Sequence, residues 1–80
     1  MAGFELFHEI ADEGSARARR FVVEHDLVET VQFRNVTYDA PAKRLAQLGG
    51  HAPALWDGAK LFVGADAVIA RLRAHLDVGR

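Results

Sequence analysis

The sequence predicts one α/β domain over residues 1–80, in which three helices pack against a four-stranded mixed sheet in the order β-α-β-α-β-β-α. Three observations predict this fold class. Half of the 80 residues are hydrophobic and 26% are charged, which is the composition of a globular chain rather than a disordered one. Short apolar segments alternate along the chain with amphipathic helical segments. An Asp-Gly pair also separates two apolar runs, which is typical of a β-hairpin.

The first half of the chain has the pattern of a β-α-β unit. Phe4–His8 alternates weakly between apolar and polar residues and predicts the first strand. Ser15 is the expected N-cap of a helix over 16–25, because its hydroxyl can accept a hydrogen bond from an unpaired N–H of the first turn. The segment 28–36 is rich in β-branched and aromatic residues and predicts the second strand. Such a unit places its two strands parallel, with a right-handed crossover.

A second helix is expected in the middle of the chain. Pro41 suits its first turn, where the N–H that proline lacks is not needed. Leu45 is expected to face the core, and Gly49-Gly50 to end the helix. The basic residues of this helix, Lys43 and Arg44, are interpreted as a solvated face.

The last third predicts a hairpin followed by a third helix. Residues 53–56 and 59–63 are expected to pair, with Asp57-Gly58 as the turn in which both central positions favour positive φ. Asp66 is the expected N-cap of the last helix. Four apolar residues of that helix share the spacing of a core-facing stripe: Val68, Ile69, Leu72 and Leu76.

Composition excludes several classes of function. The chain has no Cys, which excludes disulfides, thiolate metal sites and a cysteine nucleophile. The net charge of −1 gives no field that would recruit nucleic acid or an anionic membrane, and neither partner is expected. The apolar runs are far shorter than the roughly 20 residues of a membrane span, and the N-terminus lacks the pattern of a signal peptide, so a cytoplasmic location is expected. The four His residues are widely separated, so no metal site is expected.

The predicted element order, together with three short motifs, resembles the thioredoxin-like fold in its short glutaredoxin form. Phe4-Glu5-Leu6-Phe7 is similar to the family's first strand. Asp12-Glu13-Gly14-Ser15 falls where glutaredoxins carry Cys-Pro-Tyr-Cys, and Gly49-Gly50-His51-Ala52-Pro53 resembles the loop that leads to their cis-proline. The spacing from Pro53 to Asp66 is closer to the N-terminal domain of glutathione transferases. The resemblance covers nearly the whole chain.

The resemblance also implies where a ligand would lie. Pro53 would be the cis-proline, and the backbone of Ala52 would pair with an extended ligand such as glutathione. Asp66, at the start of the last helix, would take the γ-glutamyl ammonium. Two departures oppose glutathione. Gly64-Ala65 stands where transferases carry a Glu-Ser pair, and Glu9 stands where glutaredoxins often place a Lys.

Several residues of this region have two interpretations. Ser15 is either a transferase-style hydroxyl that stabilises a bound thiolate or a helix cap. Asp12 and Glu13 are either an acid pair or carboxylates favoured by the helix dipole. His51 stands beside the proline and is the one His worth testing. The three arginines of the first helix are either an anion patch or a solvated face: Arg17, Arg19 and Arg20.

The sequence therefore predicts a binding module without thiol–disulfide oxidoreductase activity, which uses the cis-proline loop and the start of the first helix to hold a protein or peptide. The alternative is a glutathione-binding or transferase-like protein in which Ser15 replaces the thiol. A structural or dimerising role is a third interpretation. No cofactor is expected unless glutathione binds. The predicted ligand-binding residues are Asp12, Ser15, His51, Ala52, Pro53, Ala65 and Asp66.

Overall fold

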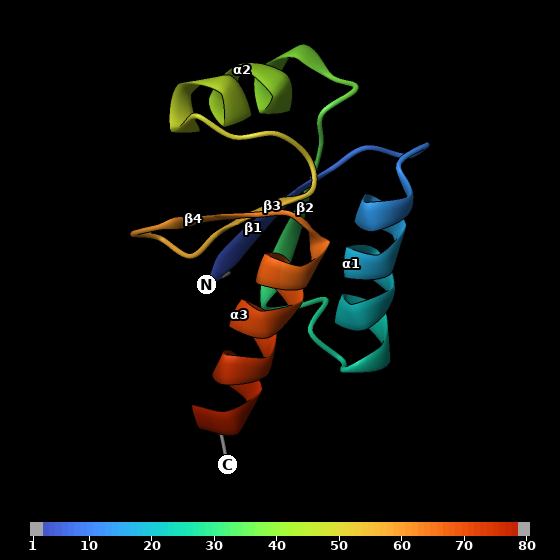
Figure 1. Ribbon diagram of the computed structural model, residues 1–80, viewed down its shortest axis with the longest axis vertical. Coiled ribbons are helices and arrows are strands. Elements are labelled where there is room, and N and C mark those ends of the chain that lie inside the picture. Colours follow the sequence, from blue (N-terminus) through green and yellow to red (C-terminus); the bar gives the residue numbers. More distant parts are fainter. Residues whose placement is uncertain (1–2, 79–80) are drawn as a thin grey trace.

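The computed structural model describes residues 3–78 and contains the seven predicted elements in the predicted order (Figure 1). The sheet order is β2-β1-β3-β4, with β1 parallel to β2 and antiparallel to β3, and with β3 antiparallel to β4. This is the arrangement of the thioredoxin-like fold, so the predicted fold class is confirmed. The elements are β1 (Phe4–His8), α1 (Glu13–Glu24), β2 (Val31–Asn35), α2 (Asp39–Leu48), β3 (Ala54–Trp56), β4 (Leu61–Val63) and α3 (Ala65–Val78).

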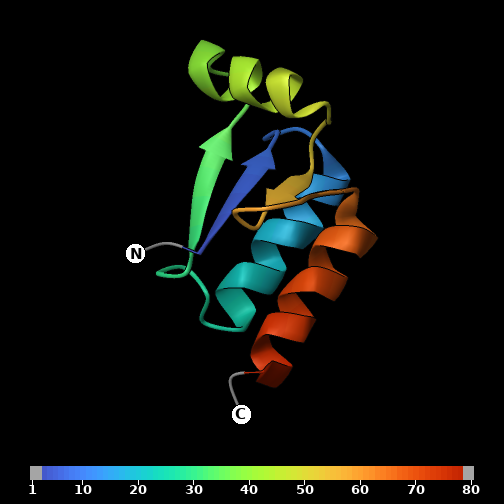
Figure 2. The ribbon, with the colours of Figure 1, turned by 90° about the vertical axis from the view of Figure 1, so that its left-hand side faces the viewer.

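Helices α1 and α3 lie side by side on one face of the sheet, and α2 lies on the other (Figures 1 and 2). The larger core cluster lies between the sheet and the helix pair, and it joins alternate residues of β1 and β3 to the apolar faces of α1 and α3. The predicted stripe of α3 is confirmed, because Val68 and Leu72 are fully buried and Ile69 and Leu76 pack against the same cluster. Removing these apolar surfaces from water is the main source of stability of the domain.

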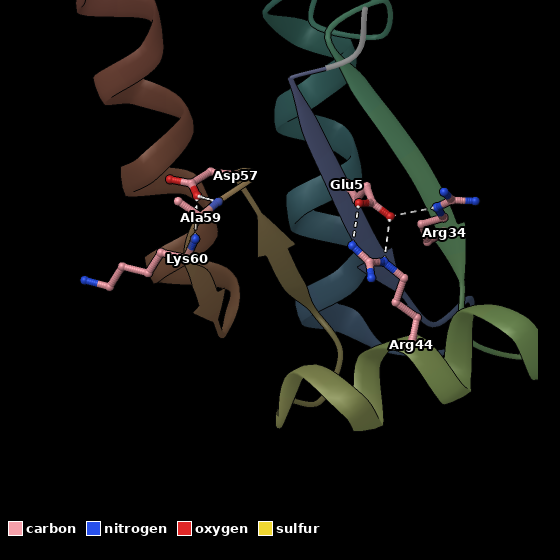
Figure 3. Close-up of polar contacts among 6 residues, drawn as sticks. All are labelled: Glu5, Arg34, Arg44, Asp57, Ala59 and Lys60. Atoms are coloured by element: carbon pink, nitrogen blue, oxygen red, sulfur yellow. Dashed lines mark hydrogen bonds and ion pairs between the residues drawn. The ribbon is translucent and has the colours of Figure 1, made fainter.

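The face that carries α2 has a smaller core and a polar clamp. Only Phe7, Leu45 and Ala54 are buried in its cluster. Beside them, Glu5 of β1 accepts hydrogen bonds from Arg34 of β2 and from Arg44 of α2, at 3.1 to 3.3 Å (Figure 3). The interpretation of Arg44 as a solvated side chain is therefore wrong. This contact fastens α2 to the sheet, and α2 leads directly into the proline loop.

The hairpin between β3 and β4 differs from the predicted two-residue turn. Trp56 pairs with Leu61, so the loop has four residues, 57–60, and only Gly58 in it has a positive φ. The Oδ1 atom of Asp57 accepts hydrogen bonds from the backbone N–H groups of Ala59 and Lys60, at 2.9 and 2.7 Å (Figure 3). This local capping by the Asp side chain favours the longer loop over a type I′ turn.

The predicted end of α2 is confirmed, because Gly49 adopts the left-handed conformation with φ of 82°. β2 is shorter than predicted, since residues 28–30 form a turn before it. No helix within residues 3–78 is long and apolar enough to cross a membrane.

Candidate functional site

The start of α1 is capped by Asp12, not by Ser15. The backbone of Asp12 is extended, and its Oδ2 atom accepts a hydrogen bond from the N–H of Ser15 at 2.7 Å. The helix therefore begins at Glu13, three residues before the predicted start. Both residue types favour the N-cap position. With Asp12 as the cap, Ser15 takes the third helical position, where its hydroxyl bonds to another part of the chain.

The hydroxyl of Ser15 holds the loop between β1 and α1. The Oγ atom of Ser15 accepts a hydrogen bond from the N–H of Glu9 at 3.0 Å, and the side chain of Ser15 is fully buried. The N–H of Glu9 lies in a loop, outside the hydrogen bonds of the sheet and helices, and Ser15 supplies its acceptor. The hydroxyl is thus part of the scaffold of the loop and does not face solvent.

Arg19 of α1 ties down the same loop. Its Nη1 atom lies 3.1 Å from Nδ1 of His8 and 3.2 Å from the carbonyl oxygen of Glu9, and its Nη2 atom lies 3.5 Å from the carbonyl oxygen of Ile10. Nδ1 of His8 must accept this bond, because a guanidinium only donates. Burial, and to a lesser degree the charge of Arg19, holds the pKa of His8 below its ordinary value of 6.5.

The proline loop lies against the start of α1. The Ala52–Pro53 peptide bond is cis, as the resemblance implied, and Pro53 is buried. A Cβ atom at Gly14 would lie 3.5 Å from Cγ and Cδ of Pro53, so the absence of a side chain at Gly14 leaves space beside the proline ring. Two elements that are far apart in the sequence therefore meet at one place.

The start of α3 also contacts the proline loop. The N–H of Gly64 donates to the carbonyl oxygen of Pro53 at 2.8 Å. Asp66 is not the N-cap of α3, because the helix begins at Ala65 and Asp66 lies within its first turn. Its carboxylate forms an ion pair with Arg17 of α1, with Nη2 of Arg17 and Oδ1 of Asp66 3.0 Å apart.

The backbone before the proline is open to pairing. Among the hydrogen bonds of residues 3–78, the N–H of Ala52 has no partner. Its carbonyl oxygen meets only Nδ1 of the adjacent His51, at 3.4 Å, and the side chain of His51 is exposed. The side chain of Ala52 packs on the smaller core cluster, which fixes the backbone in place.

The structure brings most of the predicted residues into one region, and it adds two that sequence reasoning did not assign to it. Asp12, Pro53, Ala65 and Asp66 belong to the three joined elements described above, with His51 and Ala52 on the approach to the proline and Ser15 beneath the surface. The added residues are His8 and Gly14, and Arg19, one of the arginines of the possible anion patch, holds the loop before α1. Arg19 is partly buried and bonded to His8, so its interpretation as part of a solvated face is wrong, whereas Arg17 and Arg20 are exposed and Arg17 pairs with Asp66 at the surface.

The region presents the backbone N–H of Ala52, which is unpaired within residues 3–78, and exposed side chains such as His51 and Asp66. Within the described residues, no three His, Asp or Glu side chains gather where they could hold a metal ion. The chain has no Cys, so thiol–disulfide exchange is excluded.

Comparison with protein-family models, with curated proteins and with solved structures finds no match to this chain. The likeness to the thioredoxin-like fold accordingly rests on the element order, on the strand order of the sheet and on the cis-proline loop beside the start of the first helix.

Proposed function

We propose that the chain is a cysteine-free thioredoxin-fold module that binds an extended segment of a protein or peptide at the junction of α1, the loop 51–53 and α3. The observation that carries the proposal is the open backbone of Ala52. Its N–H has no partner among the described residues, and it stands beside a buried proline that fixes the direction of the chain. An extended ligand can pair with such a backbone as one strand pairs with another.

The surroundings of Ala52 support a peptide ligand. Gly14 leaves room beside Pro53, and the loop before α1 carries Ile10, whose side chain is 61% exposed. An exposed apolar side chain and an open backbone are the two kinds of contact that extended peptides use. Arg17 and Asp66 place one charge of each sign at the margin, so the surface does not select a partner by net charge alone.

A glutathione-binding protein is the second candidate, and two contacts oppose it. Oδ1 of Asp66, the residue that would take the γ-glutamyl ammonium, already pairs with Arg17, so the guanidinium competes with a ligand ammonium for this carboxylate. The hydroxyl of Ser15, which would have to replace the thiol, is buried and bonded to Glu9. We therefore rank glutathione below a peptide.

The test is a selection followed by a titration. A displayed library of random linear peptides is selected on the full chain, and the best peptide is synthesised and titrated while backbone amide chemical shifts are followed. Glutathione and S-hexylglutathione are titrated in parallel. We expect the peptide to shift the amides of Asp12–Ser15, of His51 and Ala52 and of Gly64–Asp66, and we expect no saturable response to either form of glutathione.

His51→Ala and His25→Ala form a matched pair for this experiment, because both histidines are exposed and only His51 adjoins the open backbone. His51→Ala should weaken the peptide at least about threefold, which corresponds to a loss of about 0.7 kcal/mol, and His25→Ala should leave the affinity unchanged. A selection that yields no binder, or shifts confined to another face, would overturn the proposal. Saturable binding of glutathione that strengthens in Arg17→Ala would establish the second candidate instead.

A further inference from the structure

The outer edge of β2 is a second surface with pairing capacity. β2 is the terminal strand of the sheet, and Figure 2 shows no helix beyond it. The N–H of Phe4 donates to the carbonyl oxygen of Thr30 at 3.2 Å, and the N–H of Val36 donates to the carbonyl oxygen of His8 at 2.9 Å. In a parallel pair, alternate residues of a strand direct both backbone groups to the same neighbour. The residues of β2 that direct theirs away from β1 are therefore Val31, Phe33 and Asn35.

Two of the outward groups already have local partners. The N–H of Val31 donates to the carbonyl oxygen of Leu27 at 2.9 Å, and the carbonyl oxygen of Asn35 accepts from the N–H of Tyr38 at 3.2 Å. No partner is present within residues 3–78 for the remaining four groups, which are both backbone groups of Phe33, the carbonyl of Val31 and the N–H of Asn35. The open part of the edge is thus centred on Phe33.

This set of donors and acceptors is complementary to itself. If two copies of β2 lie antiparallel about a two-fold axis at Phe33, each Phe33 exchanges both of its backbone bonds with Phe33 of the second copy. The N–H of Asn35 then meets the carbonyl oxygen of Val31 of the second copy, and the reverse contact forms at the other end. Every open group of the edge gains a partner, and no group with a local partner has to give it up.

The side chains agree with the same register. Phe33 is 38% exposed and lies against His8, with ring centroids 5.4 Å apart, on the face that carries α1 and α3. The two-fold axis sets it against Phe33 of the second copy, which covers the exposed part of both rings. On the opposite face, Gln32 lies across from Arg34 of the second copy, so no like charges oppose each other.

We propose that two copies of this chain associate through β2, paired antiparallel about Phe33, so that their four-stranded sheets join edge to edge. The contact is short compared with a standard interface, which buries about 1,600 Å² in total, so we expect a dissociation constant on the order of 100 μM. The proposal concerns a different surface from the peptide site and stands without it.

Gln32 offers the sharpest test. Gln32→Glu sets a carboxylate across from Arg34 of the second copy, and Gln32→Lys sets an ammonium there. We therefore expect Gln32→Glu to strengthen association about three- to tenfold and Gln32→Lys to weaken it by a similar factor. Within one copy, residue 32 is the register partner of Glu5, so a carboxylate at position 32 is repelled there and an ammonium is attracted. The free energy of unfolding of the monomer should therefore decrease in Gln32→Glu, which associates more strongly, and increase in Gln32→Lys, which associates more weakly.

Sedimentation of the full chain between about 10 μM and 2 mM measures the association, and concentration-dependent amide shifts locate it. Wild type should pass from monomer to dimer with shifts at residues 31–35, and Phe33→Asp should remain monomeric. Val23→Asp is the matched control, since Val23 is an apolar residue of α1 that is 61% exposed, and it should associate like wild type. Circular dichroism verifies that each variant folds.

Three results would overturn the proposal. One is a monomer throughout the concentration range. Another is a dimer whose dissociation constant is the same in Gln32→Glu, Gln32→Lys and wild type. The third is a set of shifts that maps to β4 or to the loop 51–53 instead of β2.

Discussion

Nη2 of Arg17 lies 3.0 Å from Oδ1 of Asp66, so an ion pair joins α1 to the first turn of α3 at the margin of the proposed peptide site. The side chain of Arg17 is 50% exposed and that of Asp66 is 92% exposed. Water therefore screens the pair well, and the two residues remain available to a ligand. The contact is a feature of the surface rather than a support of the fold.

A double-mutant cycle checks this assignment. Arg17→Ala, Asp66→Ala and the double variant should each change the free energy of unfolding by less than about 1 kcal/mol, with a coupling energy below about 0.5 kcal/mol. Urea denaturation of the four proteins measures both quantities. A coupling energy above about 1 kcal/mol would instead make the pair a structural clamp between the helices.

Ser15, in contrast to Arg17 and Asp66, is expected to stabilise the fold. Ser15→Ala removes the acceptor of the Glu9 N–H from the protein, and the loss of this partly buried hydrogen bond should cost about 1 kcal/mol. Thr37→Ala, which removes an exposed hydroxyl, is the control and should cost less than about 0.5 kcal/mol. Urea denaturation compares the two. Equal stability of Ser15→Ala and wild type would show that the buried hydroxyl does not hold the loop.

The elements could be predicted because their signals are local. The apolar spacing of the helices and the glycines after α2 report on neighbours within a few residues, and the structure confirms them. The errors at Asp12 and at Asp57 arose where two local signals compete. Asp12 and Ser15 both favour a cap, and the side chain of Asp57 bonds to the backbone of its own loop, which lengthens the turn.

The contacts of the candidate site could not be predicted in the same way. Arg17 and Asp66 are separated by 49 positions, and Glu5 and Arg44 by 39, so only the folded sheet and helices bring them together. A charged side chain on a helix has the same sequence pattern whether it is solvated or paired. The placement of Pro53 came from the family resemblance and not from any pattern of charge or hydropathy.

Glu5 should make the protein sensitive to acid. The hydrogen bonds of Arg44 lower the pKa of Glu5 below its ordinary value of 4.5, with a further contribution from Arg34 and against the raising effect of burial. A carboxyl group whose pKa is lowered on folding stabilises the protein fully above its unfolded pKa. That contribution is lost as the pH falls through 4.5 toward the lower pKa of the folded state.

Glu5→Gln tests this expectation. The variant should lose about 1–3 kcal/mol at pH 7, because two arginines lose a charged acceptor. Its stability should also fall less steeply than that of wild type between about pH 5 and pH 3. Urea denaturation across that range measures both effects, with Glu29→Gln as an exposed control. Parallel acid profiles of Glu5→Gln and wild type would contradict the role assigned to the clamp.

His8 should add a second pH dependence, closer to neutrality. Its pKa is lowered in the folded state by burial and by Arg19, so the unfolded chain binds more protons than the folded one as the pH falls through 6.5. Stability therefore decreases from about pH 7.5 to about pH 5.5. His8→Gln keeps an acceptor for Arg19 but does not titrate, and it should remove this decrease, whereas the exposed His25→Gln should retain it. Because Arg19 also holds the carbonyl groups of Glu9 and Ile10, the protection factors of the amides in the loop before α1, which correct for the intrinsic pH dependence of exchange, should fall over the same range in wild type. A wild-type stability that is flat from pH 7.5 to 5.5 would contradict the assignment of His8 as a neutral acceptor.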